Sequence, residues 1–158
     1  MIPQHIHKIE RTTSENSAFH QLIAELDEDL NSRYGELQKQ YNGFNRVDKI
    51  DTVVIVRIEN EAVGCGCFKL FNSETVEIKR VFVQKSFRGN GIADAILKEL
   101  ETWAGELGFT AAVLETGKGQ PEAIRFYTKQ GYSVIPNFGQ YIGNDNSVCM
   151  KKLFHIIL

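Results

Sequence analysis

The junction within residues 81–100 constrains the fold most, because a strand-like run turns through two glycines directly into a helical pattern. The run Val81–Val83 is apolar and rich in strand-forming residues, and Gly89 and Gly91 lie just before the helical pattern. Glycines at such a turn allow several unpaired backbone N–H groups to point at one spot, near the positive end of the helix dipole. The sequence therefore predicts an anion site, although the geometry alone suits nucleotide phosphates, pyrophosphates and carboxylates alike.

The elements expected around this junction predict one mixed sheet. Runs at 51–59, 62–71 and 75–83 are typical of an antiparallel meander. The helix that follows the glycines ends at Gly108, and the apolar run Thr110–Thr116 then predicts a buried strand parallel to the one before the helix. A helix from Pro121 to about residue 131 and two closing strands, at 132–136 and 147–154, complete the pattern.

The N-terminal part predicts a first strand over His5–Thr12 and an amphipathic helix capped by Ser14. Residues 33–50 indicate a loop and a short second helix. The expected fold class is α/β of the α+β kind: a twisted, mostly antiparallel sheet with a central parallel strand pair and helices on both faces.

The composition favours a single domain over residues 1–158, because 158 residues with 42% hydrophobic content can bury one core. The formal net charge of -2 argues against a general nucleic-acid binder, and no apolar run approaches the ~20 residues of a membrane span. An odd number of cysteines, three, favours a reduced, cytoplasmic chain. The four histidines lack metal-ligand spacing, so no metal is expected.

Two motifs carry a family resemblance. The run Arg88-Gly89-Asn90-Gly91-Ile92-Ala93 fits the (Gln/Arg)-x-x-Gly-x-(Gly/Ala) signature of the GCN5-related N-acetyltransferase (GNAT) superfamily. Downstream, "LETGKGQPEAIRFYTKQGY" resembles its second hallmark, a helix that ends in Tyr and is followed by Gly-(Phe/Tyr). The resemblance implies that residues 51–153 form an acetyl-CoA-binding core and that residues 1–50 form the part that varies with the substrate.

The resemblance implies how acetyl-CoA binds. Its pyrophosphate is expected on the backbone amides of residues 88–93, and its pantetheine arm beside the strand that precedes them. Many relatives carry Asn at the place of Gln120, so whether Gln120 contacts the cofactor stays open. The cofactor-binding residues predicted in this way are Val81, Phe82, Val83, Arg88, Gly89, Asn90, Gly91, Ile92, Ala93, Asp94 and Gln120.

The resemblance also implies two catalytic residues. Glu77 stands where the histone-acetylating branch carries its general base, and a lysine-type amine needs a base because deprotonating it at pH 7 costs about 4 to 5 kcal/mol. The alternative for Glu77 is a solvent-facing side chain. Tyr127 falls at the position of the family's general acid for the leaving thiolate, and its alternative is a core aromatic. Tyr132 is better explained by strand packing.

The function expected from the resemblance is that of a cytoplasmic, acetyl-CoA-dependent N-acetyltransferase. A primary amine of a small molecule would attack the thioester directly. A protein lysine or N-terminal amine is the alternative acceptor, and a non-catalytic acyl-CoA-binding regulatory domain is the alternative of another class. Neither nucleic acid nor membrane is an expected partner, while a homodimer is one assembly that the resemblance suggests.

Overall fold

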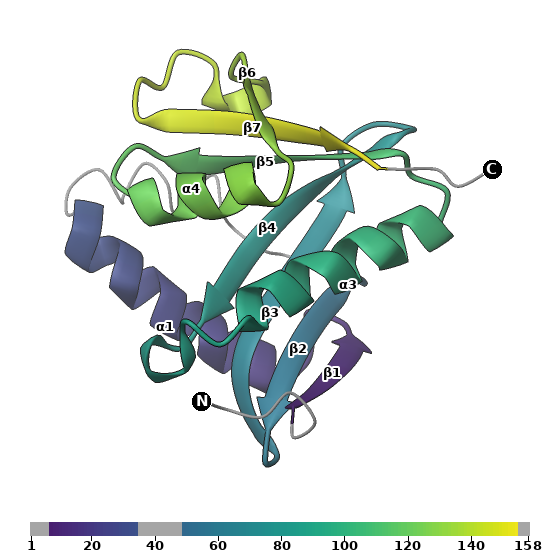
Figure 1. Cartoon of the computed structure of the whole chain (residues 1–158), viewed down its shortest axis with the longest axis vertical. Helices are drawn as coiled ribbons and strands as arrows, with labels where there is room; N and C mark the ends of the chain where they lie inside the picture. Colours follow the sequence, from purple (N-terminus) through teal and green to yellow (C-terminus); the bar gives the residue numbers. More distant parts are fainter. Residues whose placement is uncertain (1–6, 35–48, 155–158) are drawn as a thin grey trace.

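The computed structural model describes residues 7–34 and 49–154, which form one seven-stranded sheet with helices on both sides (Figure 1). The strand order is β1-β2-β3-β4-β5-β7-β6. The strands are β1 (His7–Thr12), β2 (Val53–Ile58), β3 (Glu61–Leu70), β4 (Thr75–Val83), β5 (Ala111–Gly117), β6 (Ser133–Ile135) and β7 (Ser147–Leu153). The α-helices are α1 (Ser17–Tyr34), α3 (Ile92–Glu106) and α4 (Pro121–Lys129), and two 3₁₀ turns are η3 (Lys85–Phe87) and η4 (Gly139–Tyr141).

The predicted fold class is confirmed. Strands β1 to β4 pair antiparallel in chain order, β4 pairs parallel with β5, and β7 pairs antiparallel with both β5 and β6. The helix α3 connects the two parallel strands, as the strand, helix, strand order predicts. Gly108 adopts a φ of 96° just after this helix, which is the left-handed conformation expected at a helix end.

The helices cover opposite faces of the sheet. Phe19, Leu22 and Leu26 of α1 pack with Val53 and Cys65 on one face. The other face carries a larger apolar cluster that includes the buried stripe of α3, Leu114 of β5 and Tyr127 of α4. A Cβ added to Gly66 would lie 2.8 Å from Ile96 Cγ2, so the glycine allows α3 to approach the sheet closely.

The predicted cap of the first helix is wrong. Asn16 caps α1 instead, because its side-chain oxygen accepts a hydrogen bond of 2.9 Å from the Ala18 N–H. Ser14 is buried and its hydroxyl accepts a hydrogen bond from the backbone N–H of Ile50, which ties the start of α1 to the entry of β2. The short helix expected within residues 33–50 and the beginning of the strand expected from His5 lie largely outside the described residues.

Within residues 7–34 and 49–154, no helix is both long and apolar enough to cross a membrane.

Candidate active site

The site lies where the two parallel strands separate. The strands β4 and β5 pair only from Thr75 opposite Ala111 to Glu77 opposite Val113, although both strands continue farther. Beyond the last pair lie two cavities that share part of their lining. The residues that line both cavities are Leu26, Val81, Gln120, Ala123 and Tyr127. A molecule in one cavity can therefore reach a molecule in the other.

The larger cavity, the donor cleft, has a volume of about 550 Å³ and is lined by the end of β4, the glycine loop, the first turn of α3 and one side of α4. Ten of the eleven predicted cofactor residues line it. Asn90 does not; its side-chain amide donates hydrogen bonds to the carbonyl oxygens of Phe87 and Arg88. Asn90 therefore stabilises the loop from within instead of facing the cleft.

The glycine loop presents its backbone to the donor cleft. Gly89 and Gly91 have φ angles of 83° and 77°, which residues with a Cβ rarely adopt. Among the described residues, a Cβ added at either glycine would meet no atom within 4 Å apart from those of the glycine and its two chain neighbours. Gly91 is also the N-cap of α3, and no side chain in the described part of the chain accepts a capping hydrogen bond there. The N–H groups of the first turn are thus left to bind an anion such as a pyrophosphate.

The acidic side chains of Glu25, Asp27 and Asp29 in α1 contact β4 and the loop that follows it, although a run of acidic residues is more typical of a solvated helix face. Glu25 accepts hydrogen bonds from the side-chain amide of Gln84. Asp27 forms an ion pair of 2.6 Å with Arg80, a residue of β4 with a φ of 59°. These contacts hold α1 beside the strand whose end lines both cavities.

Arg88 is held close to the donor cleft by three contacts. Its Nε donates a hydrogen bond of 2.8 Å to the carbonyl oxygen of Val83, and its guanidinium lies over the ring of Phe82. Its Nη2 is 4.0 Å from Oδ2 of Asp29 in α1. The side chain is 40% exposed, so its positive charge remains available at the mouth of the cleft.

The smaller cavity, the acceptor cavity, has a volume of about 110 Å³ and contains both carboxylates and cations. Glu77 is only 5% exposed, so the solvent-facing alternative for this residue is wrong. Its Oε2 lies 3.6 Å from Lys79 Nζ and accepts a hydrogen bond of 3.2 Å from the hydroxyl of Tyr141, while its Oε1 lies 3.9 Å from Lys69 Nζ. Glu77 is therefore held among two ammonium groups and a phenol.

Lys79 completes this buried network. Its ammonium donates a hydrogen bond of 3.4 Å to Tyr141 Oη. Burial lowers the pKa of Lys79, and the nearby carboxylate of Glu77 opposes this effect. Tyr141 is 1% exposed and belongs to η4, in the connection between β6 and β7, so a segment far along the chain brings its hydroxyl to β4.

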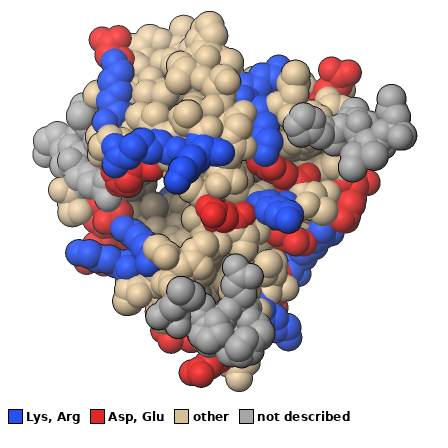
Figure 2. Space-filling model, viewed as in Figure 1, with Lys and Arg blue, Asp and Glu red and all other residues tan. Residues whose placement is uncertain are grey.

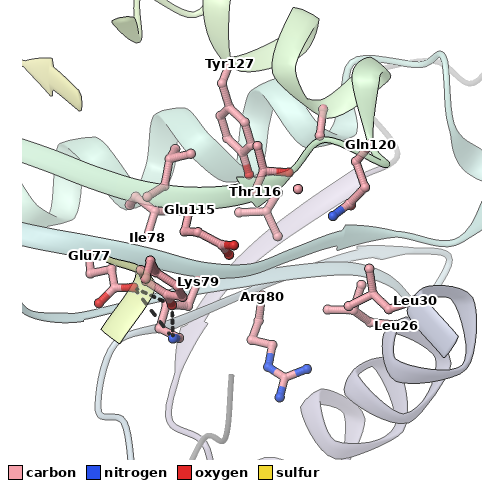
Figure 3. A pocket seen from close by; sticks show the side chains of 15 residues that line it. Leu26, Leu30, Glu77, Ile78, Lys79, Arg80, Glu115, Thr116, Gln120 and Tyr127 are labelled. Atoms are coloured by element: carbon pink, nitrogen blue, oxygen red, sulfur yellow. Dashed lines mark hydrogen bonds and ion pairs between the residues drawn. The ribbon is translucent and has the colours of Figure 1, made fainter. Parts of the chain in front are cut away.

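Glu115 is a further carboxylate of the acceptor cavity that the sequence analysis missed. It lies on β5, and its carboxylate points into the cavity between β4 and the ring of Tyr127 (Figure 3). Burial raises the pKa of Glu115 to about 7, partly opposed by a hydrogen bond of 2.7 Å from the Ser147 hydroxyl and by Lys79. A charged residue inside the otherwise apolar strand "AAVLETG" was the signal available in the sequence.

Tyr127 faces the point where the two cavities meet. It is 8% exposed, belongs to the apolar cluster and stacks edge-to-face with Tyr132, so it has core packing as well as a place in the site. Burial raises the pKa of Tyr127, which keeps its hydroxyl protonated at neutral pH. The hydroxyl of Tyr132 instead donates to Glu101, which agrees with its predicted packing role.

The face of the molecule drawn in Figure 2 carries both basic and acidic side chains, and side chains of both kinds surround a hollow in this face. Within the described ranges 7–34 and 49–154, no cluster of three or more His, Cys, Asp or Glu side chains has the arrangement of a metal site.

The sequence matches the model of the Acetyltransferase (GNAT) family over residues 13–132. An IAA acetyltransferase from Azospirillum brasilense is 33% identical over 146 residues, covering 91% of this chain and 95% of the relative. Acetyltransferase Atu2258 from Agrobacterium fabrum is 26% identical over 111 residues, covering 70% and 80%.

Solved structures show the same fold. The crystal structure of a candidate acyl-CoA N-acyltransferase from Klebsiella pneumoniae is 29% identical, with a TM-score of 0.80 and coverage of 95% of this chain and 99% of that one. A GNAT family acetyltransferase from Elizabethkingia anophelis, solved with acetyl-CoA bound, is 20% identical, with a TM-score of 0.69 and coverage of 96% and 100%.

Proposed function

Because the chain belongs to the GNAT acetyltransferase family, we propose that it transfers the acetyl group of acetyl-CoA to a primary amine of a small molecule. The observation that carries this proposal is the meeting of two unlike cavities at Tyr127. One is lined by open backbone suited to a phosphate-bearing donor, and the other contains carboxylates suited to a cationic acceptor. The acetyl group would pass from one to the other without leaving the protein.

Acetyl-CoA fits the donor cleft as the cosubstrate. Its pyrophosphate would lie on the N–H groups at residues 89–93, and Arg88 would add positive charge at the mouth. Its pantetheine arm would run beside Val81–Val83, where β4 no longer pairs with β5 and has backbone groups to offer. The thioester would then lie near Tyr127, which lines both cavities.

The acceptor amine would enter the smaller cavity as an ammonium, which the carboxylates of Glu77 and Glu115 attract. Only a neutral amine can attack the thioester carbonyl, so a carboxylate must first take a proton, and Glu77 is the candidate that the sequence predicts. A volume of about 110 Å³ suits the amine end of a compact substrate.

Tyr127 would stabilise the leaving thiolate. The attack forms a C–N bond and breaks the C–S bond, and the sulfur then takes a proton or a hydrogen bond from the phenol. The buried hydroxyl remains protonated at neutral pH, as this role requires. The proton that the phenol gives up is replaced by the one that the nitrogen loses as the amide forms.

The cytoplasm is the proposed location, because Cys65, Cys67 and Cys149 are all free and buried, as in a reduced protein. The homodimer that the resemblance suggests remains a prediction, which sedimentation analysis would check.

The test is an assay of thiol release from acetyl-CoA with a panel of amines. The panel should contain diamines, amino acids, aminoglycosides, and peptides with a lysine or a free N-terminus. We expect release that depends on a small primary amine and yields its N-acetyl derivative by mass spectrometry. Exclusive acetylation of peptides would contradict the small-molecule acceptor. Acetyl-CoA binding without turnover on any amine would favour a regulatory acyl-CoA-binding domain.

A further inference from the structure

Within the reaction proposed above, on which this inference rests, we infer that Glu115 of β5, rather than Glu77 of β4, accepts the proton that the acceptor ammonium loses before it attacks. The two carboxylates lie on the same face of the sheet, because Glu77 is paired with Val113 and Glu115 is two residues farther along β5. They differ in what surrounds them and in how they face the cavity.

The carboxylate oxygens of Glu77 already have partners within the protein. Two ammonium groups and a hydroxyl lie within 4 Å of its oxygens, those of Lys79, Lys69 and Tyr141. Both oxygens of Glu77 therefore already have partners, and a substrate ammonium would have to compete with Lys79, Lys69 and the Tyr141 hydroxyl to reach either of them. In Figure 3 its carboxylate lies to the side of the cavity, joined to Lys79 by a dashed line. Its position suits a side chain that holds Lys79 and Tyr141 in place better than one that contacts the reacting amine.

Glu115 has the opposite surroundings. Among the described residues, its one hydrogen bond is from Ser147 Oγ to Oε2, so Oε1 is left to face the cavity. Figure 3 shows this carboxylate in the middle of the cavity, between Lys79 and Tyr127. An amine placed there lies between the proton acceptor and the tyrosine that faces the thioester.

The titration of Glu115 supports the same assignment. A lysine-type amine with a pKa of about 10.4 lies about 6 units above an ordinary glutamate and only about 3 units above a carboxyl of pKa about 7. The groups that face Glu115 are Glu77 and Lys79 from β4, Ser147 and Cys149 from β7, Tyr141 from η4 and Tyr127 from α4. Among these, Ser147 and Lys79 favour the carboxylate, whereas burial and Glu77 favour the acid.

The step is balanced without any further reactant. The Glu115 carboxylate takes one proton from the ammonium, and the neutral amine attacks the thioester carbon. The second nitrogen proton leaves as the amide forms, and the thiolate departs as a thiol through Tyr127. Glu115 then returns its proton to solvent and is a carboxylate again for the next acceptor.

The first experiment measures kcat/KM against pH with an amine that the wild-type protein acetylates. Glu115→Gln should lower kcat/KM at pH 7 by about 10²-fold and lose the acidic limb that wild type shows near pH 7. Ser147→Ala removes the hydrogen bond that lowers the pKa of Glu115, so its acidic limb should move to higher pH. Glu101→Gln is the matched control, because Glu101 also accepts a hydrogen bond but lies outside both cavities. The pH dependence of kcat/KM in Glu101→Gln should match that of wild type.

A second measurement does not depend on the acceptor. A carboxyl whose pKa is raised from 4.5 to about 7 by folding binds more protons in the folded state, so stability falls as pH rises between these values. The Tm of Glu115→Gln minus that of wild type should therefore increase from pH 4.5 to about 7 and stay level above. A difference that is constant over this range would overturn the assignment.

The experiments distinguish a failure of the proposed function from a failure of the assignment of Glu115. Wild-type protein that releases no thiol with any amine contradicts the proposed function itself. An active wild type whose acidic limb is unchanged in Glu115→Gln and Ser147→Ala overturns the inference alone. Loss of that limb in Glu77→Gln instead would return the role of base to Glu77.

Discussion

The donor cleft and the acceptor cavity meet at Tyr127 but are built in different ways. The donor cleft takes most of its lining from one continuous segment, residues 81–94, with glycines that leave N–H groups open. The acceptor cavity uses side chains that come from α1, β4, β5, α4 and η4. The difference teaches that a site built from local backbone geometry can be found in the sequence, whereas one assembled from distant side chains depends on the fold.

The largest effect is expected at the point where the two cavities meet. Tyr127→Phe should lower kcat by about 10²-fold and change the KM for acetyl-CoA by less than about twofold, because the hydroxyl acts on the leaving sulfur. The measurement is steady-state kinetics with saturating amine. Tyr132→Phe is the control, since it removes a hydrogen bond to Glu101 and should lower Tm without lowering kcat. Full turnover by a folded Tyr127→Phe protein would make Tyr127 a core residue only.

A change in the donor cleft should separate the two regions. Gly91→Val should weaken acetyl-CoA binding at least tenfold, about 1.4 kcal/mol, because its φ of 77° disfavours valine and its side chain would enter the space beside the exposed N–H groups. Calorimetry measures the affinity. Gly105→Val in the same helix is a matched control, because a Cβ added to Gly105 would have no neighbour within 4 Å and the residue lies outside both cavities. Unchanged affinity in folded Gly91→Val would contradict the backbone cradle.

A change in the acceptor cavity should leave the donor cleft unaffected. Tyr141→Phe removes the hydroxyl between Lys79 and Glu77, so kcat/KM for the amine should fall about 3- to 10-fold, the value of one lost hydrogen bond. The affinity for acetyl-CoA, measured by calorimetry, should stay within about twofold. A loss of acetyl-CoA affinity as large as the loss in kcat/KM would mean that the two regions are not independent.

The smallest effect is expected at Gln120, which lines both cavities and is the N-cap of α4 without a capping hydrogen bond from its side chain. Gln120→Asn should supply that bond and add about 1 kcal/mol of stability, a rise in Tm of about 2 to 4 °C. Thermal unfolding is the measurement. An unchanged or lowered Tm would show that Gln120 stabilises the start of α4 in another way.

Much of the fold could be predicted because its signals are local. The β2 to β4 meander, the parallel pair and the end of α3 at Gly108 follow from alternation, helical spacing and a glycine stop. The cap of α1 could not be identified in the same way. Ser14 and Asn16 are both good capping residues, and only the tertiary contact of Ser14 with Ile50 decides between them.

The candidate site likewise could be predicted only where its signals are local in the sequence. The ten cofactor residues that line the donor cleft were predicted from the resemblance that two sequence motifs carry. The prediction fails for Asn90, because the pattern does not tell a side chain that faces the ligand from one that holds the loop. Glu115 and Lys79 were missed because their roles depend on where β4 and β5 part. Burial by other elements, not local sequence, gives these residues their chemistry.

The central claim is that the acetyl group passes directly from acetyl-CoA to the amine where the two cavities meet. Two-substrate initial-rate kinetics, combined with the intact mass of protein incubated with acetyl-CoA alone, tests it most directly. Direct transfer predicts intersecting reciprocal plots and an unmodified protein, since both substrates must be bound together. Parallel plots, together with an acetylated protein that passes its acetyl group to an added amine, would contradict the account.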